Sequence, residues 1–236
     1  MNLKKEIWLE EDFKDFRLYL DSLAEASYQA FILKLIPNLS TCRGIRSPIM
    51  QKNIKDIQKG NWESFLNITP ESYEERLVVA SLLGKIPSFE QLLLKLEAFL
   101  PYVDNWAVCD TLAGSLRQFG ENEEHGFEYA TSLVHRKEAY SKRLGTVLLL
   151  IYYAKEPYMD AIIALVPAIQ HEDYYVKMGV AWLVSKLYIS DSIKTKVLFE
   201  GKLDAFTHSK SISKICDSFQ ISMSDKEIAK SYRKKR

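Results

Sequence analysis

The chain has 236 residues, 47% of them hydrophobic and 27% charged, with 32 basic against 31 acidic side chains. Domains average roughly 150 residues, so this length predicts one or two domains with a core that needs no metal or disulfide staples. The balanced, apolar-rich composition excludes a disordered polyelectrolyte. The charge is nevertheless uneven, because residues 201–236 carry nine basic and four acidic side chains, a net +5, and residues 1–200 sum to −4.

The three cysteines, Cys42, Cys109 and Cys216, are widely spaced and form no CxxC pair. This spacing argues against a disulfide framework and against a cysteine-rich zinc site. The N-terminal residues lack the apolar run of a signal peptide, and no apolar segment approaches the ~18 residues that a membrane-spanning helix needs. We therefore expect a reduced, soluble protein of the cytoplasm that makes no membrane contact.

Apolar residues recur at helical spacing from the start of the chain. The first expected helix, 11–23, has one apolar stripe made of Phe13, Phe16, Leu20 and Leu23. The second, 26–37, stops at a proline. Further along, Ser47 as N-cap and Pro48 at the first helical position predict a helix that ends at Gly60.

The rest of the chain continues this pattern. Thr69-Pro70-Glu71 predicts the start of a helix that runs to residue 86, and Pro87-Ser88 predicts one over 89–100. Further helices are expected at 103–119, 122–135, 139–154, 158–170, 173–189 and 191–200, and within 211–233. No segment shows strand-like alternation with hairpin turns. About a dozen helices with short connections predict one continuous all-α domain, 1–236, whose helix pairs can stack into an α-solenoid without a clean repeat period.

The segment 104–114 contains two side chains suited to chemistry. Trp106 and Asp110 are four residues apart, so they share one face of a helix that Asp104 or Asn105 caps. Asp110 lies beyond the first turn, where the helix dipole no longer stabilises a carboxylate strongly. A carboxylate beside an indole on a helix with few charges needs a partner, which is either a ligand or an ion pair to a neighbouring helix.

Two other segments could approach a ligand. Lys142 and Arg143 are adjacent cations ahead of an apolar run, so they either bind phosphate or form a surface pair with its charges in water. Gly179 shares a helix face with Val176 and Leu183, and its missing side chain admits either a ligand or a closely packed helix.

Several kinds of chemistry have no support in the sequence. The four histidines, at 125, 135, 171 and 208, show no HxxxH or HExxH spacing. The chain has no glycine-rich nucleotide-binding loop and no GxSxG motif. We therefore expect no metal site, no nucleotide or other cofactor and no serine-hydrolase activity.

Taken in order, four segments resemble the AlkD-like DNA alkylation repair family of HEAT-like helical-repeat DNA glycosylases. They are Arg43-Gly44-Ile45-Arg46-Ser47-Pro48, Trp106-Ala107-Val108-Cys109-Asp110, Lys142-Arg143 before the apolar run, and Tyr174-Tyr175-Val176-Lys177 through to Trp182. The resemblance covers most of the chain and implies a right-handed superhelix of antiparallel HEAT-like helix pairs whose concave face binds duplex DNA. It also implies excision of positively charged alkylated purines, of the 3-methyladenine and 7-methylguanine type, without metal or cofactor.

The resemblance also implies roles for individual residues. Asp110 would be the catalytic carboxylate, and Trp106 and Trp182 the aromatic walls of the site. Arg143 would bind the DNA backbone, with further phosphate contacts from Lys142, Arg46 and Lys177. The basic C-terminal segment, about 224–236, would either contact phosphates or be a solvated chain end.

These residue types suit the chemistry. Alkylation at N3 or N7 puts positive charge on the base and weakens the N-glycosidic bond, so a carboxylate can stabilise the sugar cation and orient the attacking water. Indole faces attract cations within about 6 Å. The leading hypothesis is a monomeric, monofunctional alkylpurine DNA glycosylase that acts on alkylated double-stranded DNA. The alternatives are a non-catalytic homologue that binds damaged or branched DNA, and a helical-repeat protein scaffold.

Overall fold

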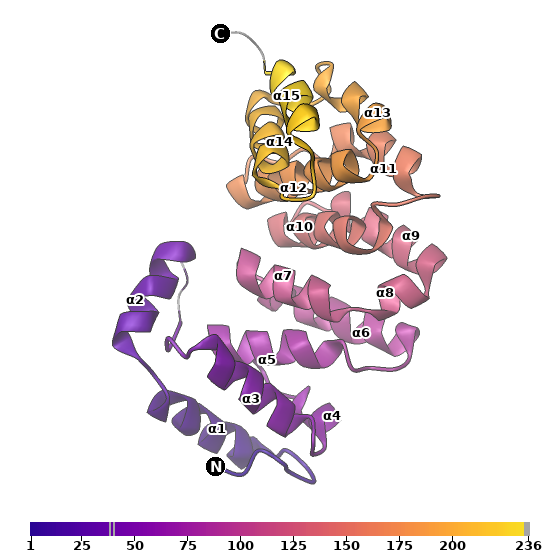
Figure 1. The fold of residues 1–236 in the computed structure, drawn as a ribbon. Coiled ribbons are helices and arrows are strands. Elements are labelled where there is room, and N and C mark those ends of the chain that lie inside the picture. The colour runs from indigo at the N-terminus through magenta and orange to yellow at the C-terminus, as the bar shows by residue number, and fades with distance from the viewer. Residues whose placement is uncertain (38, 40, 234–236) are drawn as a thin grey trace. The chain divides into compact units, whose positions relative to one another are not determined.

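The computed structural model describes residues 1–37, 39 and 41–233, which contain fifteen α-helices and no strand. The all-helical prediction is therefore confirmed for this part of the chain. The chain divides into two compact units, residues 1–118 (unit 1) and 119–236 (unit 2). Figure 1 shows the helices of unit 1 from indigo to magenta and those of unit 2 from pink to yellow.

Unit 1 is built on a series of packed helices around an aromatic cluster. Its elements are α1 (Glu10–Ser22), α2 (Ala26–Leu35), α3 (Ser47–Ile57), α4 (Trp62–Phe65), α5 (Tyr73–Leu83), α6 (Phe89–Phe99), the 3₁₀ helix η1 (Leu100–Tyr102) and α7 (Trp106–Ser115). α5 packs against both α3 and α7. The expected stripe of α1 is buried at Phe13, Phe16 and Leu20. Trp8 and Phe65 join the two phenylalanines in a cluster whose contacting ring centroids are 4.8–5.9 Å apart.

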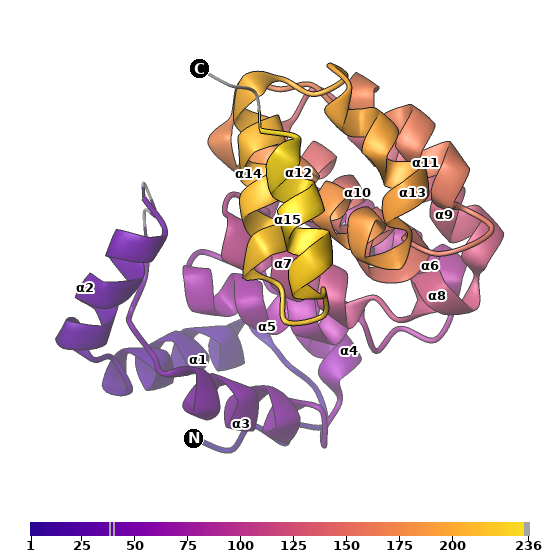
Figure 2. The ribbon, with the colours of Figure 1, turned by 45° about the horizontal axis from the view of Figure 1, so that its top comes forward.

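Unit 2 begins within the short helix α8 (Gln118–Glu121). Its further elements are α9 (Glu123–Val134), α10 (Ala139–Leu148), the π-helical turn η2 (Leu149–Tyr153), α11 (Met159–Leu165), the 3₁₀ helix η3 (Val166–Ala168), α12 (Tyr174–Ser190), α13 (Ser192–Thr195), the 3₁₀ helix η4 (Lys196–Phe199), α14 (Ala205–Asp217) and α15 (Met223–Ser231). α10 packs against α9 and α12, and α14 packs against α12 and α15. Figure 2 shows α12, α14 and α15 together.

Several helix starts differ from the sequence prediction. Arg46 is the N-cap of α3, so Ser47 is already helical. α5 begins at Tyr73 rather than after Thr69, because the Ser72 hydroxyl accepts the backbone N–H three residues later and caps the helix there. Ser88 caps α6 as predicted. α14 begins at residue 205, six residues before the expected segment, because Asp204 accepts two backbone N–H groups of its first turn.

Two further expectations concern membranes and the chain end. In the described part of the chain, no helix is both long and apolar enough to cross a membrane. The expected basic segment at 224–236 includes most of α15. Its last three cations, Lys234, Lys235 and Arg236, lie outside the described residues.

Candidate nucleic-acid interface

The start of α7 sets the position of the expected catalytic pair. The side-chain oxygen of Asn105 accepts two backbone N–H groups of the first turn, at 3.1 and 3.0 Å, so the helix begins at Trp106. Asp104, the other candidate cap, instead forms an ion pair with Arg76 at 2.5 Å. Trp106 and Asp110 therefore lie one turn apart on the same helix face, and both are half-buried.

The indole of Trp106 is fixed by the end of α2. Its Nε1–H donates a hydrogen bond to the backbone carbonyl of Leu35, the last residue of that helix, at 3.2 Å. The last carbonyls of a helix have no intrahelical partner, so this bond satisfies two polar groups at once. One edge of the ring is thus held in place while the side chain stays accessible.

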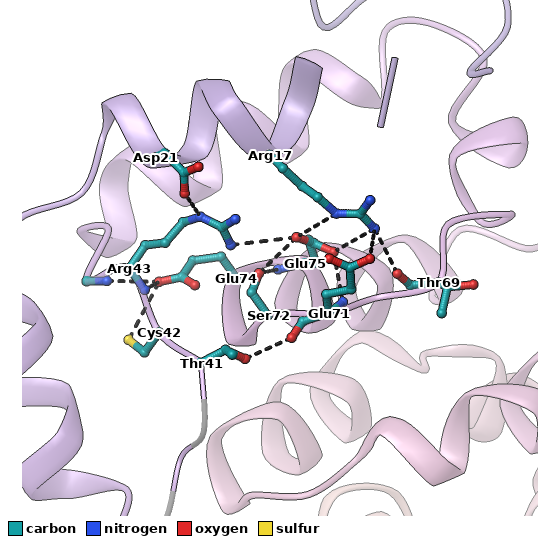
Figure 3. Close-up of polar contacts among 11 residues, drawn as sticks. Arg17, Asp21, Thr41, Cys42, Arg43, Thr69, Glu71, Ser72, Glu74 and Glu75 are labelled. Atoms are coloured by element: carbon teal, nitrogen blue, oxygen red, sulfur yellow. Dashed lines mark hydrogen bonds and ion pairs between the residues drawn. The ribbon is translucent and has the colours of Figure 1, made fainter. Parts of the chain in front are cut away.

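A buried carboxylate on α5 organises the loop that leads into α3 (Figure 3). Glu74 is 1% exposed, and its Oε1 accepts the backbone N–H groups of Arg43 and Gly44 at 2.9 and 3.0 Å. The Sγ of Cys42 lies 3.6 Å from the same oxygen. Burial and the carboxylate raise the pKa of the Cys42 thiol to about 11, so this cysteine is protonated and unreactive at neutral pH.

The same loop is pressed against α2. Gly44 has φ +75°, and a Cβ at this position would lie 2.3 Å from the backbone nitrogen of Gln29. The side-chain amide of Gln29 donates to the carbonyl of Cys42. Only glycine fits here, because any side chain would meet both an unfavourable backbone conformation and the backbone of α2. The backbone conformation and the close contact with α2 therefore account for the glycine in the first family-like segment.

Glu75 is a second buried carboxylate beside Glu74 and ties α1 to this loop (Figure 3). Its side chain is fully buried and lies 3.5 Å from Arg17 and 3.6 Å from Arg43. It also accepts hydrogen bonds from the Ser72 hydroxyl at 3.1 Å and from a backbone N–H at 2.9 Å. Neither glutamate was expected from the sequence, although Ser72 and Glu75 have the spacing of a capping box, a signal that points to Glu75.

Arg46 is an exposed cation on unit 1. Its Nε–H donates to both carboxylate oxygens of Glu25, at 3.0 and 2.9 Å. Its guanidinium lies 5.3 Å from the centroid of the Tyr28 ring. The expected phosphate contact thus starts from a cation that already has an acidic and an aromatic neighbour, and DNA would compete with Glu25 for it.

The expected surface alternative for Lys142 and Arg143 is wrong, because both side chains are buried on α10. Lys142 is 7% exposed, and its ammonium donates to the carbonyl of Val134 at the end of α9. Burial lowers the pKa of Lys142. A phosphate contact by this lysine requires its buried ammonium to become accessible. In this structure its positive charge stabilises the C-terminal carbonyls of α9.

Arg143 joins α10 to α12. It is 5% exposed, and its Nη1–H donates to the carbonyl of Tyr175 at 2.5 Å. A Cβ placed on Gly179 would lie 3.5 Å from Nη1 and 3.7 Å from Cγ of Arg143. Of the two alternatives left open for Gly179, the structure therefore supports close helix packing, with the arginine side chain as the neighbour.

Trp182 lies three residues after Gly179 on α12 and is 38% exposed, so it is not the core residue that an isolated tryptophan usually is. The ammonium of Lys214, on α14, lies 5.9 Å from the centroid of the Trp182 ring. Lys177, on the first turns of α12, forms an ion pair with the exposed Glu172 at 3.0 Å. Both an aromatic surface and cations are therefore accessible on unit 2.

The expected site residues divide between the two units. Unit 1 contains Trp106, Asp110 and Arg46, and unit 2 contains Lys142, Arg143, Lys177 and Trp182. Within unit 1, one helix face brings the first two together. Within unit 2, Arg143 lies beside Gly179, close to Trp182 along α12. Among the residues that the structure describes, no three His, Cys, Asp or Glu side chains are grouped so that they could hold a metal ion.

These features define an all-helical protein that offers a carboxylate and an indole on one capped helix, and on another helix an exposed indole with a lysine ammonium over its ring. The family model of the DNA alkylation repair enzymes matches residues 15–196 of the chain. The chain therefore belongs to the DNA alkylation repair enzyme family. A search of the curated proteins finds no match to it. Helices α14 and α15 lie beyond the matched residues.

Proposed function

We propose that this protein is a monofunctional DNA glycosylase that hydrolyses the N-glycosidic bond of positively charged alkylated purines in duplex DNA. The observation that carries the proposal is the Trp106–Asp110 pair: a half-buried carboxylate and a half-buried indole, one turn apart on a helix inside the family match. The lesions are of the 3-methyladenine and 7-methylguanine type. No lysine is invoked as a nucleophile, so we expect no lyase activity on the abasic product.

The chemistry requires little beyond these groups. An alkylated purine carries a positive charge and is a good leaving group, so it needs no general acid. As the bond breaks, positive charge moves onto the deoxyribose, where Asp110 stabilises it and orients the attacking water. The indole faces of Trp106 and Trp182 attract the same cation. Damage would be recognised through the backbone of the nucleotide, on an open surface.

The DNA backbone is held by cations in this proposal. Arg143 is the main contact in this proposal, because a guanidinium matches phosphate geometry and its side chain is already held between α10 and α12; its buried donors must become accessible when DNA binds. Arg46 and Lys177 contribute further phosphate contacts. Lys142 contributes only if its buried ammonium becomes accessible to a phosphate.

We further infer that the helices form one HEAT-like superhelix with a concave DNA-binding face, acting as a monomer in the cytoplasm. The serial packing of α3, α5 and α7 in unit 1, and of α10, α12 and α14 in unit 2, supports this arrangement. Solenoids are built from such nearest-neighbour contacts, in which each repeat packs only against the next.

Release of methylated bases from alkylated duplex DNA tests the proposal. Wild-type protein should release them, and Asp110→Asn should lower the rate about 10²–10³-fold, the loss typical for removal of one electrostatic stabiliser. Asp15→Asn, an exposed carboxylate on α1, is the matched control and should keep wild-type activity. Salt-sensitive DNA binding without base release would instead identify a non-catalytic DNA-binding homologue. Neither release nor binding would identify a protein scaffold.

A further inference from the structure

Helix α14 presents two lysines in register with two aromatic rings. Lys210 and Lys214 are one turn apart, so about 6 Å separates them along the helix axis. The ammonium of Lys210 lies 5.7 Å from the centroid of the Phe206 ring on its own helix. That of Lys214 lies 5.9 Å from the centroid of the Trp182 ring on α12. All four side chains are partly exposed.

These residues belong to one continuous surface of unit 2. Tyr174, at the start of α12, is 52% exposed, and its ring centroid lies 5.6 Å from that of Phe206. Trp182 and Lys214 meet two turns further along both helices, so α12 and α14 run side by side in the same direction. α12 contributes the rings of Tyr174 and Trp182, and α14 contributes the two cations. We refer to these four residues and Phe206 as the α12–α14 face.

A row of cations held over rings is suited to an anionic chain. The rings restrict each lysine to one region of the surface, so less conformational freedom is lost when it binds phosphate. Helix α14 itself carries two lysines and one acidic residue, a net charge of +1. Within α14 the one acidic residue is Asp217, at its last position.

We propose that α14 is a DNA-contact helix whose Lys210 and Lys214 bind backbone phosphates of the duplex. The inference rests on the proposed function, because it takes DNA as the partner. It goes beyond the family match, which ends at residue 196, before α14 begins.

The salt dependence of duplex binding tests this proposal. Each phosphate contact adds about 0.9 to the slope of log affinity against log salt, which is about 3.5-fold in affinity between 50 and 200 mM. Lys210→Gln and Lys214→Gln should each reduce the slope by about 0.9. The double variant should therefore lose about 12-fold less affinity than wild type over that range. Lys214→Arg keeps the charge and should keep the wild-type slope.

The matched control is Lys196→Gln, which removes an exposed lysine of η4 in the same unit. Circular dichroism melting should show that every variant is folded. If the slopes of both α14 variants equal that of the control, the proposal is wrong, and it is also wrong if wild-type protein shows no salt-dependent binding. Base release tells this failure apart from failure of the proposed function. Active wild type with unchanged slopes overturns only the role of α14, whereas reduced slopes without base release support that role and refute the glycosylase.

Discussion

Replacement of Glu74 by alanine should selectively loosen the loop between α2 and α3. The carboxylate accepts the backbone N–H groups of Arg43 and Gly44, and alanine would leave both donors without it. A buried donor that loses its partner costs about 1–3 kcal/mol. The Gly44 bond is buried and the Arg43 bond is only partly so, hence we expect a total loss of about 2–4 kcal/mol.

The loss of stability should depend on which side chain replaces Glu74. Glu74→Gln keeps one oxygen that can accept the two N–H groups, but it loses the charge that strengthens them, so its loss should be smaller than that of alanine. Glu90→Ala, on the exposed first turn of α6, is the control and should change stability by less than about 0.5 kcal/mol.

Thermal melting and amide hydrogen exchange together measure this prediction. A loss of 2–4 kcal/mol corresponds to a fall in melting temperature of roughly 4–16 °C for a chain of this size. The amides of Arg43 and Gly44 should exchange faster in Glu74→Ala, whereas amides in unit 2 should not. The prediction is wrong if Glu74→Ala has the same melting temperature as the Glu90→Ala control. It is also wrong if the amides of Arg43 and Gly44 exchange no faster in Glu74→Ala than in wild type.

Two further predictions concern α10 and α12. Gly145→Ala should be destabilising, because its Cβ would lie 2.6 Å from the carbonyl oxygen of Ala130. Gly179→Ala should be neutral or stabilising by about 0.4–1 kcal/mol, since the nearest neighbours of its Cβ are at 3.5 Å or more. Urea unfolding of the two variants measures both free energies of unfolding. Burial lowers the pKa of Lys142 below the usual lysine value of 10.5, so the unfolded chain binds more protons than the folded chain between the lowered pKa and 10.5. The stability of wild type relative to Lys142→Met should therefore rise as the pH increases toward 10.5, and a flat difference would contradict this.

Sequence patterns predicted most helices because their signals are local. Asn105 and Ser88 are short polar residues before apolar runs, and each caps the expected helix. α14 begins earlier than the apolar pattern predicts, at a capping residue of the same kind, Asp204. The pattern of buried residues on α14 includes small polar ones, such as Ser211 and Thr207, which a search for apolar periodicity does not count.

Buried charges were the main feature that the sequence could not predict. Glu74 and Glu75 are adjacent acids on a helix, a pattern that usually lies in water, yet both are fully enclosed. Their partners come from α1 and from a loop about 30 residues away. Lys142 and Arg143 are likewise buried because carbonyl groups of α9 and α12 accept their hydrogen bonds. Such acceptors belong to the backbone of distant segments, and no residue type in the sequence identifies them.

This contrast changes how the family-like segments bear on activity. Gly44 is explained by its close contact with α2, and the Lys142–Arg143 pair by its bonds to the carbonyls of two other helices. A homologue without catalytic activity would keep these residues to preserve its fold. Trp182 is different, because its side chain is 38% exposed, and the exposed part of an indole adds little to the free energy of unfolding. A functional reason for an exposed tryptophan is therefore stronger than one for a buried arginine, and Trp182→Leu should reduce base release while leaving the melting temperature nearly unchanged.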